Sequence, residues 1–320
     1  MRAVVVTRNG GPEVLQLQEV PAPEAGPGQV VVDVEAAGAN YRDIYEREGT
    51  EGGKPPLVAG IEGAGTVTAV GEGVGDLSIG DRVAWAAAQG SYAERVAVDA
   101  EAAVPIPDGL SSEVAAAAIL QGMTAHYLAT STYPVRPGDD VIVHAAAGGV
   151  GLLLIQVVKQ RGGRVIATTS SEEKAQLARG AGADEVLGYQ GFGERARALS
   201  SGEGVHVVYD GIGKATFDES LGSLRPRGYM VLYGSASGPV PPVDPRRLVA
   251  GGSLFLTRPT LRHYTAHREE LLERASDVFS WIVDGKIEVR VGARYLLAEA
   301  NRAQENLQSR RTTGKLILTP

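Results

Sequence analysis

The chain has 320 residues, of which 43% are hydrophobic, and its formal net charge at pH 7 is -7. Since domains typically contain about 100 to 200 residues, this length predicts two domains with buried cores. The sequence contains no apolar stretch of about 18 residues, and its N-terminus, MRAVVVTRNGG, does not resemble a signal peptide. We therefore expect a cytoplasmic protein without a membrane-spanning helix.

Charge and cysteine content exclude several classes of function. The acidic chain has no stripe or tail rich in Lys and Arg, so nucleic acid is not expected as its main partner. Because there is no cysteine, disulfides, cysteine-ligated zinc and thiolate nucleophiles are excluded. The low methionine content, three residues, together with many arginines is typical of a protein from a thermophile.

The first hundred residues have the pattern of a compact β domain. Runs of β-branched residues broken by Gly and Pro predict strands over residues 2–6, 29–38, 63–74, 81–86 and 91–98. Strands this short favour a barrel-like sheet over units with long crossover connections.

The pattern changes near residue 107. A long helix is predicted to begin there, with Ser111 or Ser112 as its N-cap. Beyond a turn at residues 136–140, strands alternate with helices, which predicts a parallel sheet with helices on its faces. The predicted strands cover residues 141–146, 164–169, 185–189, 205–213 and 228–237, and the predicted helices cover 149–161 and 172–182.

The last part of the chain predicts a strand over residues 253–259, an amphipathic helix over about 266–284 and a final strand in GKLILTP. The final strand has no place in the alternating pattern, so we expect it to return to the first domain. That domain is then discontinuous. The predicted domains are residues 1–112 with 256–320, and residues 113–255.

A glycine-rich turn, HAAAGGVG, lies between the first strand of the alternating part and its helix. Against the dinucleotide-binding pattern G-x-G-x-x-G, it places Ala146, Gly148 and Gly151, so the first glycine is replaced. Gly148 lets main-chain N–H groups approach a pyrophosphate, Gly151 lets the helix pack on the strand, and the helix N-terminus favours an anion. We interpret the turn as a dinucleotide site. The alternative is a tight turn that binds no ligand.

The end of the second strand of this part indicates which dinucleotide binds. Sites selective for NAD commonly place an acid there for the ribose 2′-hydroxyl, whereas this chain has Thr169 and Ser170. Hydroxyl groups do not repel a 2′-phosphate, and Lys174, one helical turn later, can pair with it. We therefore predict NADPH as the cofactor. The alternative for Lys174 is a solvated lysine on a helix surface.

Nine segments, in order along nearly the whole chain, resemble one family. It is the zinc-independent quinone oxidoreductases of the medium-chain dehydrogenase/reductase superfamily, the group that includes zeta-crystallin. The segments are GANYRDIYEREG, GIEGAGTVTAVGEGV, GDRVAW, QGMTAHYL, HAAAGGVG, EEKAQLARGAGAD, VVYDGIG, LYGSASG and SLFLTRPTL. The resemblance implies an α/β protein with a Rossmann domain, which is a doubly wound parallel sheet, and a discontinuous, β-rich, GroES-like barrel domain.

Zinc alcohol dehydrogenases of the superfamily contain a Gly-His-Glu segment where this chain has Gly60-Ile61-Glu62. Together with the absence of cysteine, this difference predicts that the protein binds no metal. His263 and His267 have i,i+4 spacing, for which we favour an exposed pair on a helix over a metal site.

The resemblance also implies which residues bind NADPH, between the two domains. They are Asn40, Thr124, Gly148, Gly149, Val150, Ser170, Lys174, Tyr189, Ile212, Tyr233, Ser235, Phe255, Thr257 and Arg310. Of these, the resemblance places Asn40 and Thr124 beside the nicotinamide ring and its ribose. For Tyr189 and Tyr233, core residues at strand ends are the alternative.

The candidate catalytic residues are Asp43, Tyr45 and Arg258, which match a polar group that the family places near the nicotinamide. A second tyrosine expected a few residues later is replaced by Glu51 or its neighbours. The alternative for the segment YRDIYERE is a charged helix or loop surface.

The resemblance implies an enzyme that transfers a hydride or single electrons from NADPH to a quinone without a metal. One alternative is the reduction of enones or 2-alkenals, and another is a crystallin-like protein that binds NADPH without turnover. The family also implies a homodimer. The apolar segment GGSLFLTRP would be the edge strand that pairs across a twofold axis, unless it is an internal strand of the parallel sheet.

Overall fold

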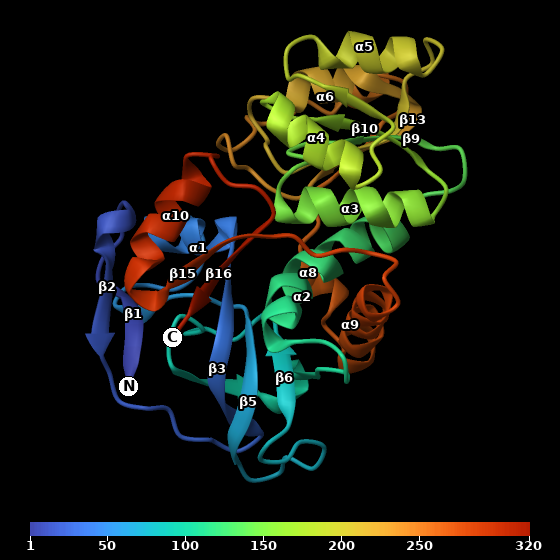
Figure 1. The fold of residues 1–320 in the computed structure, drawn as a ribbon. Helices are drawn as coiled ribbons and strands as arrows, with labels where there is room; N and C mark the ends of the chain where they lie inside the picture. Colours follow the sequence, from blue (N-terminus) through green and yellow to red (C-terminus); the bar gives the residue numbers. More distant parts are fainter. The chain divides into compact units, whose positions relative to one another are not determined.

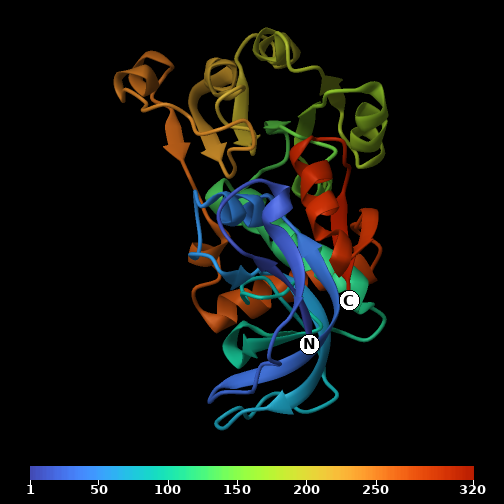
Figure 2. The same cartoon turned by 90° about the vertical axis from the view of Figure 1, so that its left-hand side faces the viewer.

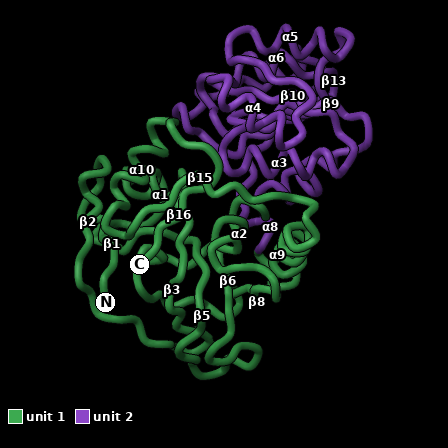
Figure 3. The backbone as a smooth tube through the Cα atoms, viewed as in Figure 1, with its two compact units in different colours: residues 1–123, 266–320 green, residues 124–265 purple.

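The computed structural model describes residues 1–320, which divide into two compact units. Unit 1 contains residues 1–123 and 266–320, and unit 2 contains residues 124–265 (Figure 3). Residues 113–123 and 256–265 therefore lie in the opposite unit to the one expected. The predicted domain limits stay a prediction, since a compact unit does not by itself define a domain.

Unit 1 is built on two sheets whose buried residues are mostly valine and alanine. The larger sheet has the order β15-β16-β3-β5-β6-β8, with β7 paired to β3, and the smaller one the order β2-β1-β4 (Figure 1). The strands are β1 Arg2–Val6, β2 Leu15–Glu19, β3 Gln29–Ala39, β4 Leu57–Val58, β5 Gly63–Val70, β6 Arg82–Trp85, β7 Arg95–Asp99, β8 Val104–Pro105, β15 Val291–Leu296 and β16 Lys315–Thr319.

The C-terminal strand returns to the first part of the chain, as predicted. β16 pairs antiparallel with β3, and Leu316 faces Ala39. Both termini lie in unit 1 (Figure 2).

The helices that begin in unit 1 are α1 Tyr41–Glu48, α2 Ser112–Tyr127, α9 Arg268–Val283 and α10 Ala300–Gln308. Three short 3-10 turns cover η1 Pro12–Val14, η2 Ala100–Ala102 and η4 Leu297–Glu299. Of the two serines considered as the cap of α2, Ser111 fills this role, because its hydroxyl accepts a hydrogen bond from the N–H of Val114 at 3.3 Å. None of the helices combines the length and the hydrophobicity that a membrane-spanning segment needs.

Unit 2 contains one sheet of six parallel strands in the order β11-β10-β9-β12-β13-β14. Counted along the chain, this is the order 3-2-1-4-5-6 of a Rossmann fold. The strands are β9 Asp140–Val143, β10 Arg164–Thr168, β11 Glu185–Leu187, β12 Val205–Asp210, β13 Leu224–Leu232 and β14 Phe255–Thr257.

Both faces of this sheet are covered, as a doubly wound sheet requires. Ile142 and Val208 belong to a core that includes Phe192 of α5 and Phe217 of α6. Val143, which follows Ile142 on β9, points to the opposite face of the sheet and is also fully buried. The helix α3 packs on β9 and β10. The helices are α3 Gly149–Gln160, α4 Glu172–Gly180, α5 Phe192–Leu199, α6 Phe217–Ser223, α7 Arg246–Ala250 and α8 Leu261–Tyr264, and a π-helical turn, η3 Leu128–Thr132, follows α2.

The structure decides two further expectations from the sequence. β14 is the last strand of the six-stranded sheet. This confirms the predicted edge strand, and the alternative of an internal strand is wrong. His263 and His267 are both exposed, as expected, but they do not form a pair on one helix. His263 lies in α8, whereas His267 precedes α9, so the two residues do not share a helix.

Candidate functional site

The turn between β9 and α3 contains the residues predicted to bind pyrophosphate. The N–H of Gly148 donates to Ala145 O at 2.9 Å, and Ala145 itself has a φ of 49°. Gly148 is the N-cap of α3. The N–H groups of the first helical turn, including those of Gly149 and Val150, have no carbonyl partner within the helix, and the helix dipole adds partial positive charge. This turn can therefore bind an anionic group.

Gly151 allows α3 to approach the turn that precedes it. A Cβ atom at this position would lie 2.5 Å from Ala145 O and 2.8 Å from Ala146 Cα. Both are main-chain atoms, which cannot rotate away as the end of a side chain can. Gly151 therefore allows α3 to pack closely, as predicted, but against the turn that follows β9 and not against the strand itself.

The segment after β10 contains the residues predicted to meet the 2′-phosphate. Ser171 is the N-cap of α4, and its hydroxyl accepts a hydrogen bond from the N–H of Lys174 at 3.3 Å. Ser170 is exposed and Lys174 is half-buried. The strand end has no acid, since Glu172 and Glu173 lie in the first turn of the helix. Ser170 and Lys174 thus lie at the same end of α4.

Tyr189 connects this segment to the turn before α3. Its hydroxyl accepts a hydrogen bond from the N–H of Ala145 at 3.2 Å and donates one to Thr168 O at 3.4 Å. The side chain is half-buried. Tyr189 therefore lies at the carboxyl ends of β9 and β10, where a Rossmann fold binds its ligand.

The ends of β12 and β13 hold Ile212, Tyr233 and Ser235. Asp210, the last residue of β12, accepts a hydrogen bond from the N–H of Ile212 at 2.7 Å, which fixes the turn. A Cβ atom on Gly211 would lie 2.9 Å from the Tyr233 ring, so the glycine leaves room for this side chain. Burial raises the pKa of the Tyr233 phenol, which therefore keeps its proton at neutral pH.

The predicted residues of β14 do not all lie at its end. Thr257 is the last residue of the strand, and Arg258 follows it and donates from Nη1 to Leu232 O at 3.3 Å. Phe255 faces Tyr229 of β13, and the two rings stack with their centroids 4.5 Å apart. Phe255 is the first residue of β14, and its ring packs on Tyr229 and does not lie at the carboxyl end of the strand.

Thr124, the first residue of unit 2, is buried within α2.

In unit 1, Asn40 and Asp43 are joined at the start of α1. The main-chain N–H of Asn40 donates to Asp43 Oδ2 at 2.8 Å, and the Tyr92 hydroxyl donates to the same oxygen at 2.7 Å. Asp43 is 3% exposed, and its Oδ1 is buried without a hydrogen-bond partner. Burial raises the pKa of Asp43 to about 7, against the two hydrogen bonds, which lower it. In this structure, Asp43 acts on the backbone of Asn40.

Two buried charged residues that the sequence analysis did not select surround the amide of Asn40. Asn40 Nδ2 donates to Glu62 Oε2 at 2.7 Å, and Lys315 Nζ donates to Asn40 Oδ1 at 2.8 Å and also pairs with Glu62 Oε2. The sequence contains a weak signal for Lys315, because a lysine begins the otherwise apolar strand KLILT.

Tyr45 and Arg310 lie on different elements of unit 1. Tyr45 is half-buried on α1, and Arg310 follows α10 with a φ of 59°. Burial raises the pKa of Tyr41, and a hydrogen bond with Arg310 opposes this rise. α1 is not the charged surface considered for YRDIYERE, since several of its charged side chains are buried. These are Asp43, Glu46 and Arg47.

The residues of this chain do not fit a zinc site. No three His, Cys, Asp or Glu side chains form a group that could hold a metal ion. In the segment Gly60-Ile61-Glu62, the central side chain has no ligand atom, and the glutamate pairs with Lys315.

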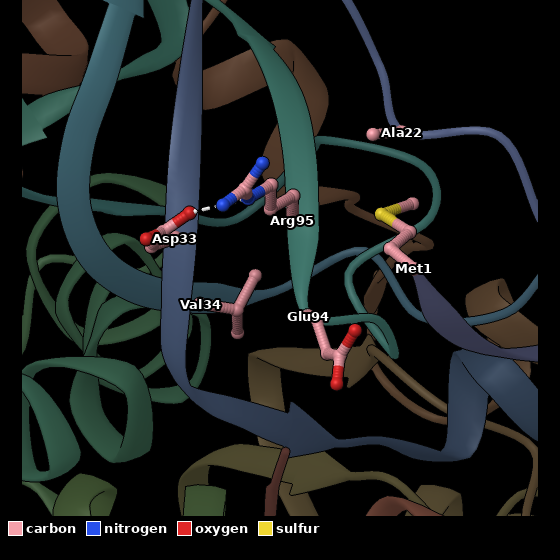
Figure 4. A pocket seen from close by; sticks show the side chains of 6 residues that line it. All are labelled: Met1, Ala22, Asp33, Val34, Glu94 and Arg95. Atoms are coloured by element: carbon pink, nitrogen blue, oxygen red, sulfur yellow. Dashed lines mark hydrogen bonds and ion pairs between the residues drawn. The ribbon is translucent and has the colours of Figure 1, made fainter.

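A hollow of about 440 Å³ lies elsewhere in unit 1, beside β3 and β7 (Figure 4). Its residues are Met1, Ala22, Asp33, Val34, Glu94 and Arg95. Two of these residues, Asp33 and Arg95, form an ion pair of 2.8 Å. None of the predicted site residues lines this hollow.

Comparisons with known proteins agree with the fold. Residues 26–108 match the alcohol dehydrogenase GroES-like domain, and residues 149–280 match the zinc-binding dehydrogenase family. Quinone oxidoreductase from Salmonella typhimurium is 43% identical over 98% of both chains, and 2-haloacrylate reductase from a Burkholderia species is 40% identical over 99% of this chain and 98% of its own. The structure of Escherichia coli quinone oxidoreductase complexed with NADPH is 39% identical over the whole of both chains, with a TM-score of 0.98.

Proposed function

Because this chain belongs to the quinone oxidoreductase family of the medium-chain dehydrogenase/reductase superfamily, as its sequence predicted, we propose that it is an NADPH-dependent quinone reductase. The observation that supports this most is the turn of residues 144–151. It joins β9 to α3, and β9 lies where the strand order reverses, at the point where Rossmann folds bind dinucleotides. The NADPH complex of the Escherichia coli relative agrees with this choice of cofactor.

The cofactor contacts that we propose follow the two halves of the dinucleotide. The N–H groups of Gly149 and Val150 hold the pyrophosphate at the N-terminus of α3. Ser170 and Lys174 hold the adenosine 2′-phosphate through a hydroxyl and an ammonium group. The further contacts are those of Asn40, Thr124, Gly148, Tyr189, Ile212, Tyr233, Ser235, Phe255, Thr257 and Arg310.

When bound, NADPH supplies the hydride that reduces the acceptor. The charge that develops on the acceptor oxygen then has to be stabilised by hydrogen-bond donors of this chain. We assign this role to the Tyr45 hydroxyl and the Arg258 guanidinium group. Asp43 serves as a positioning residue, because its carboxyl group holds the main-chain N–H of Asn40.

Oxidation of NADPH, followed by absorbance with a panel of ortho- and para-quinones and in the presence of EDTA, tests the proposal. We expect turnover with at least one quinone, and we expect EDTA to leave the rate unchanged. Tight NADPH binding without turnover of any acceptor would instead identify a crystallin-like binding protein.

A second candidate is the reduction of an electron-poor C=C bond next to a carbonyl group. The 40% identical Burkholderia relative, a 2-haloacrylate reductase, supports it. This reaction adds hydride to carbon and requires a proton at the neighbouring carbon. An enone panel assayed beside the quinones separates the two functions, since quinone reduction predicts the larger kcat/KM for quinones.

We also propose a homodimer that pairs through β14. The strand lies at the edge of the six-stranded sheet, and Phe255 on it is 49% exposed. An exposed edge strand with apolar side chains is a template for pairing with a second chain.

A cytoplasmic location and a thermophilic source remain proposals from composition. Fractionation of the native host tests the first. For the second, we expect a thermal midpoint above about 65 °C, since domains of mesophilic proteins unfold at about 45 to 65 °C.

A further inference from the structure

A buried ion pair in unit 1 lies against the amide of Asn40. Lys315 of β16 is 1% exposed and Glu62, just before β5, is fully buried. The Lys315 ammonium pairs with Glu62 Oε2 and donates to Asn40 Oδ1 at 2.8 Å. Glu62 Oε1 accepts a hydrogen bond from the N–H of Leu120 at 2.8 Å, so the pair also connects to α2.

These charges allow only one orientation of the Asn40 amide. Nδ2 donates to Glu62 Oε2 at 2.7 Å and to Gly38 O at 3.1 Å, and Oδ1 accepts from Lys315. If the amide were rotated by half a turn, its oxygen would face the carboxylate and its N–H groups would face the ammonium. Both contacts are repulsive, and inside a protein they are screened less than in water.

The second acceptor position of the Asn40 amide oxygen is only weakly occupied. Besides the bond from Lys315, this oxygen accepts a long hydrogen bond of 3.4 Å from Gln121 Nε2. A carbonyl oxygen can accept two hydrogen bonds. A ligand hydroxyl that came within about 2.8 Å of Oδ1 would form a stronger bond than Gln121 does.

Stability alone does not account for this ion pair. Replacing a buried ion pair by apolar residues of similar volume is often neutral or stabilising, because removing two charges from water costs free energy. The surrounding chain nevertheless makes room for the pair. A Cβ atom on Gly38 would lie 2.6 Å from Lys315 Cε.

We infer that Lys315 and Glu62 are positioning residues, which fix the Asn40 amide so that Oδ1 accepts a hydrogen bond from the nicotinamide-side ribose hydroxyl of NADPH. This inference rests on the proposed function, because the resemblance to the family is what assigns Asn40 to the cofactor. It adds that the C-terminal strand contributes to cofactor binding through a residue that does not touch the cofactor.

The test is a mutant cycle that joins the ion pair to Asn40. Lys315→Met alone leaves a buried carboxylate unpaired and can prevent folding, so the pair is neutralised in the double variant Lys315→Met/Glu62→Gln. This variant and Asn40→Ala are combined in a triple variant. The NADPH dissociation constant is measured by cofactor fluorescence, and thermal midpoints and kcat with a quinone are recorded for each protein.

We expect the double variant and Asn40→Ala each to weaken NADPH binding by about tenfold, since misplacing a binding group by a small distance has effects of this order or larger. The triple variant should bind no more weakly than Asn40→Ala, because the pair acts through that amide. The control is Lys159→Met/Asp184→Asn, which neutralises a half-exposed ion pair of 2.8 Å in unit 2. It should bind NADPH as the wild type does.

Two results would overturn the inference alone: a double variant with a lower thermal midpoint but wild-type NADPH binding, or losses that add fully in the triple variant. Wild-type binding by Asn40→Ala would do the same, while quinone turnover by the wild type would leave the proposed function intact. A wild-type protein that does not bind NADPH would overturn the function and the inference together.

Discussion

Asp43 couples the stability of the protein to pH. Its pKa rises from 3.8 to about 7 on folding, mainly through burial, so the folded protein holds this proton more tightly than the unfolded chain. The free energy of unfolding that depends on Asp43 is therefore highest below pH 4 and is lost as the pH rises through 7. The free energy of unfolding of Asp43→Asn, measured with urea, should not show this loss. Relative to the wild type, it should therefore rise by more than about 1 kcal/mol from pH 5 to pH 8.

A surface carboxyl provides the comparison for Asp43. Asp33 pairs with Arg95 at 2.8 Å, but both side chains are about half exposed. Asp33→Asn should therefore change stability by nearly the same small amount at both pH values. If Asp43→Asn behaved in the same way, the buried carboxyl would not hold its proton near neutral pH.

Lys174 is expected to decide between the two nicotinamide dinucleotides. A hydrogen bond to a charged group contributes about 1.5–3 kcal/mol, so Lys174→Glu should lower the ratio of kcat/KM for NADPH over NADH by at least about tenfold. Arg195→Glu, at an exposed position of α5, makes the same change in charge and should leave the ratio as it is. An unchanged ratio in Lys174→Glu would show that this lysine is a solvated surface residue.

For single residues, the sequence predicted which positions belong to a motif, but it could not predict which distant residues a side chain contacts. Gly148 and Gly151 follow from the spacing of the turn. The contact between Glu62 and Lys315 joins positions 253 apart in the sequence, so no local pattern indicates it. For the same reason, the sequence could not show that Asp43, in a segment rich in charges, lies buried beneath Tyr92.

Elements with a strong apolar pattern were predicted, and short polar ones were not. The alternation of β9, α3 and β10 is clear, because the apolar residues of these elements are nearly continuous. The predicted strand over 141–146 was too long, since Ala145 adopts a φ of 49° that its side chain does not reveal. The helix α6, with the sequence FDESLGS, was not predicted because it is only two turns long and contains a glycine.

The contact between α3 and the turn before it depends on Gly151. In Gly151→Ala, the added methyl group meets Ala145 O and Ala146 Cα, and these main-chain atoms have to shift. We expect a loss of about 1–3 kcal/mol in the free energy of unfolding, as is typical of overpacking. NADPH binding should weaken as well, because the N–H groups of the first turn move with the helix. Urea unfolding and cofactor fluorescence measure the two effects.

Gly222→Ala is the matched control, since this glycine also lies in a helix, α6, but a Cβ atom there would meet nothing within 4 Å. It should stabilise the protein by up to about 1 kcal/mol through helix propensity and leave NADPH binding unchanged. A Gly151→Ala protein as stable as wild type would mean that α3 can move without cost.

For the molecule as a whole, the return of the C-terminal strand followed from the sequence by elimination. The alternation of strands and helices had ended before GKLILTP, so this strand had no obvious place in the parallel sheet. Its partners could not be predicted, because antiparallel pairing with β3 depends on the register of two strands more than 270 positions apart. The division between the units is likewise a property of contacts and not of composition.

The edge strand β14 is where we expect two chains to meet. Near a twofold axis, a charge introduced by one substitution faces the same charge on the other chain. A single substitution therefore destabilises the interface from both sides. Phe255→Lys should therefore shift the mass measured by sedimentation from two chains to one at micromolar concentration.

The control is Ile79→Lys, which also introduces a lysine, at a side chain of unit 1 that is 70% exposed. It should leave the dimer intact. Because Phe255 also stacks on Tyr229, the thermal midpoint of Phe255→Lys is measured together with its mass. A monomer whose midpoint is largely retained would show that the substitution disrupts the dimer and not the fold. A wild-type monomer, or a Phe255→Lys dimer, would place the contact between chains elsewhere or remove it.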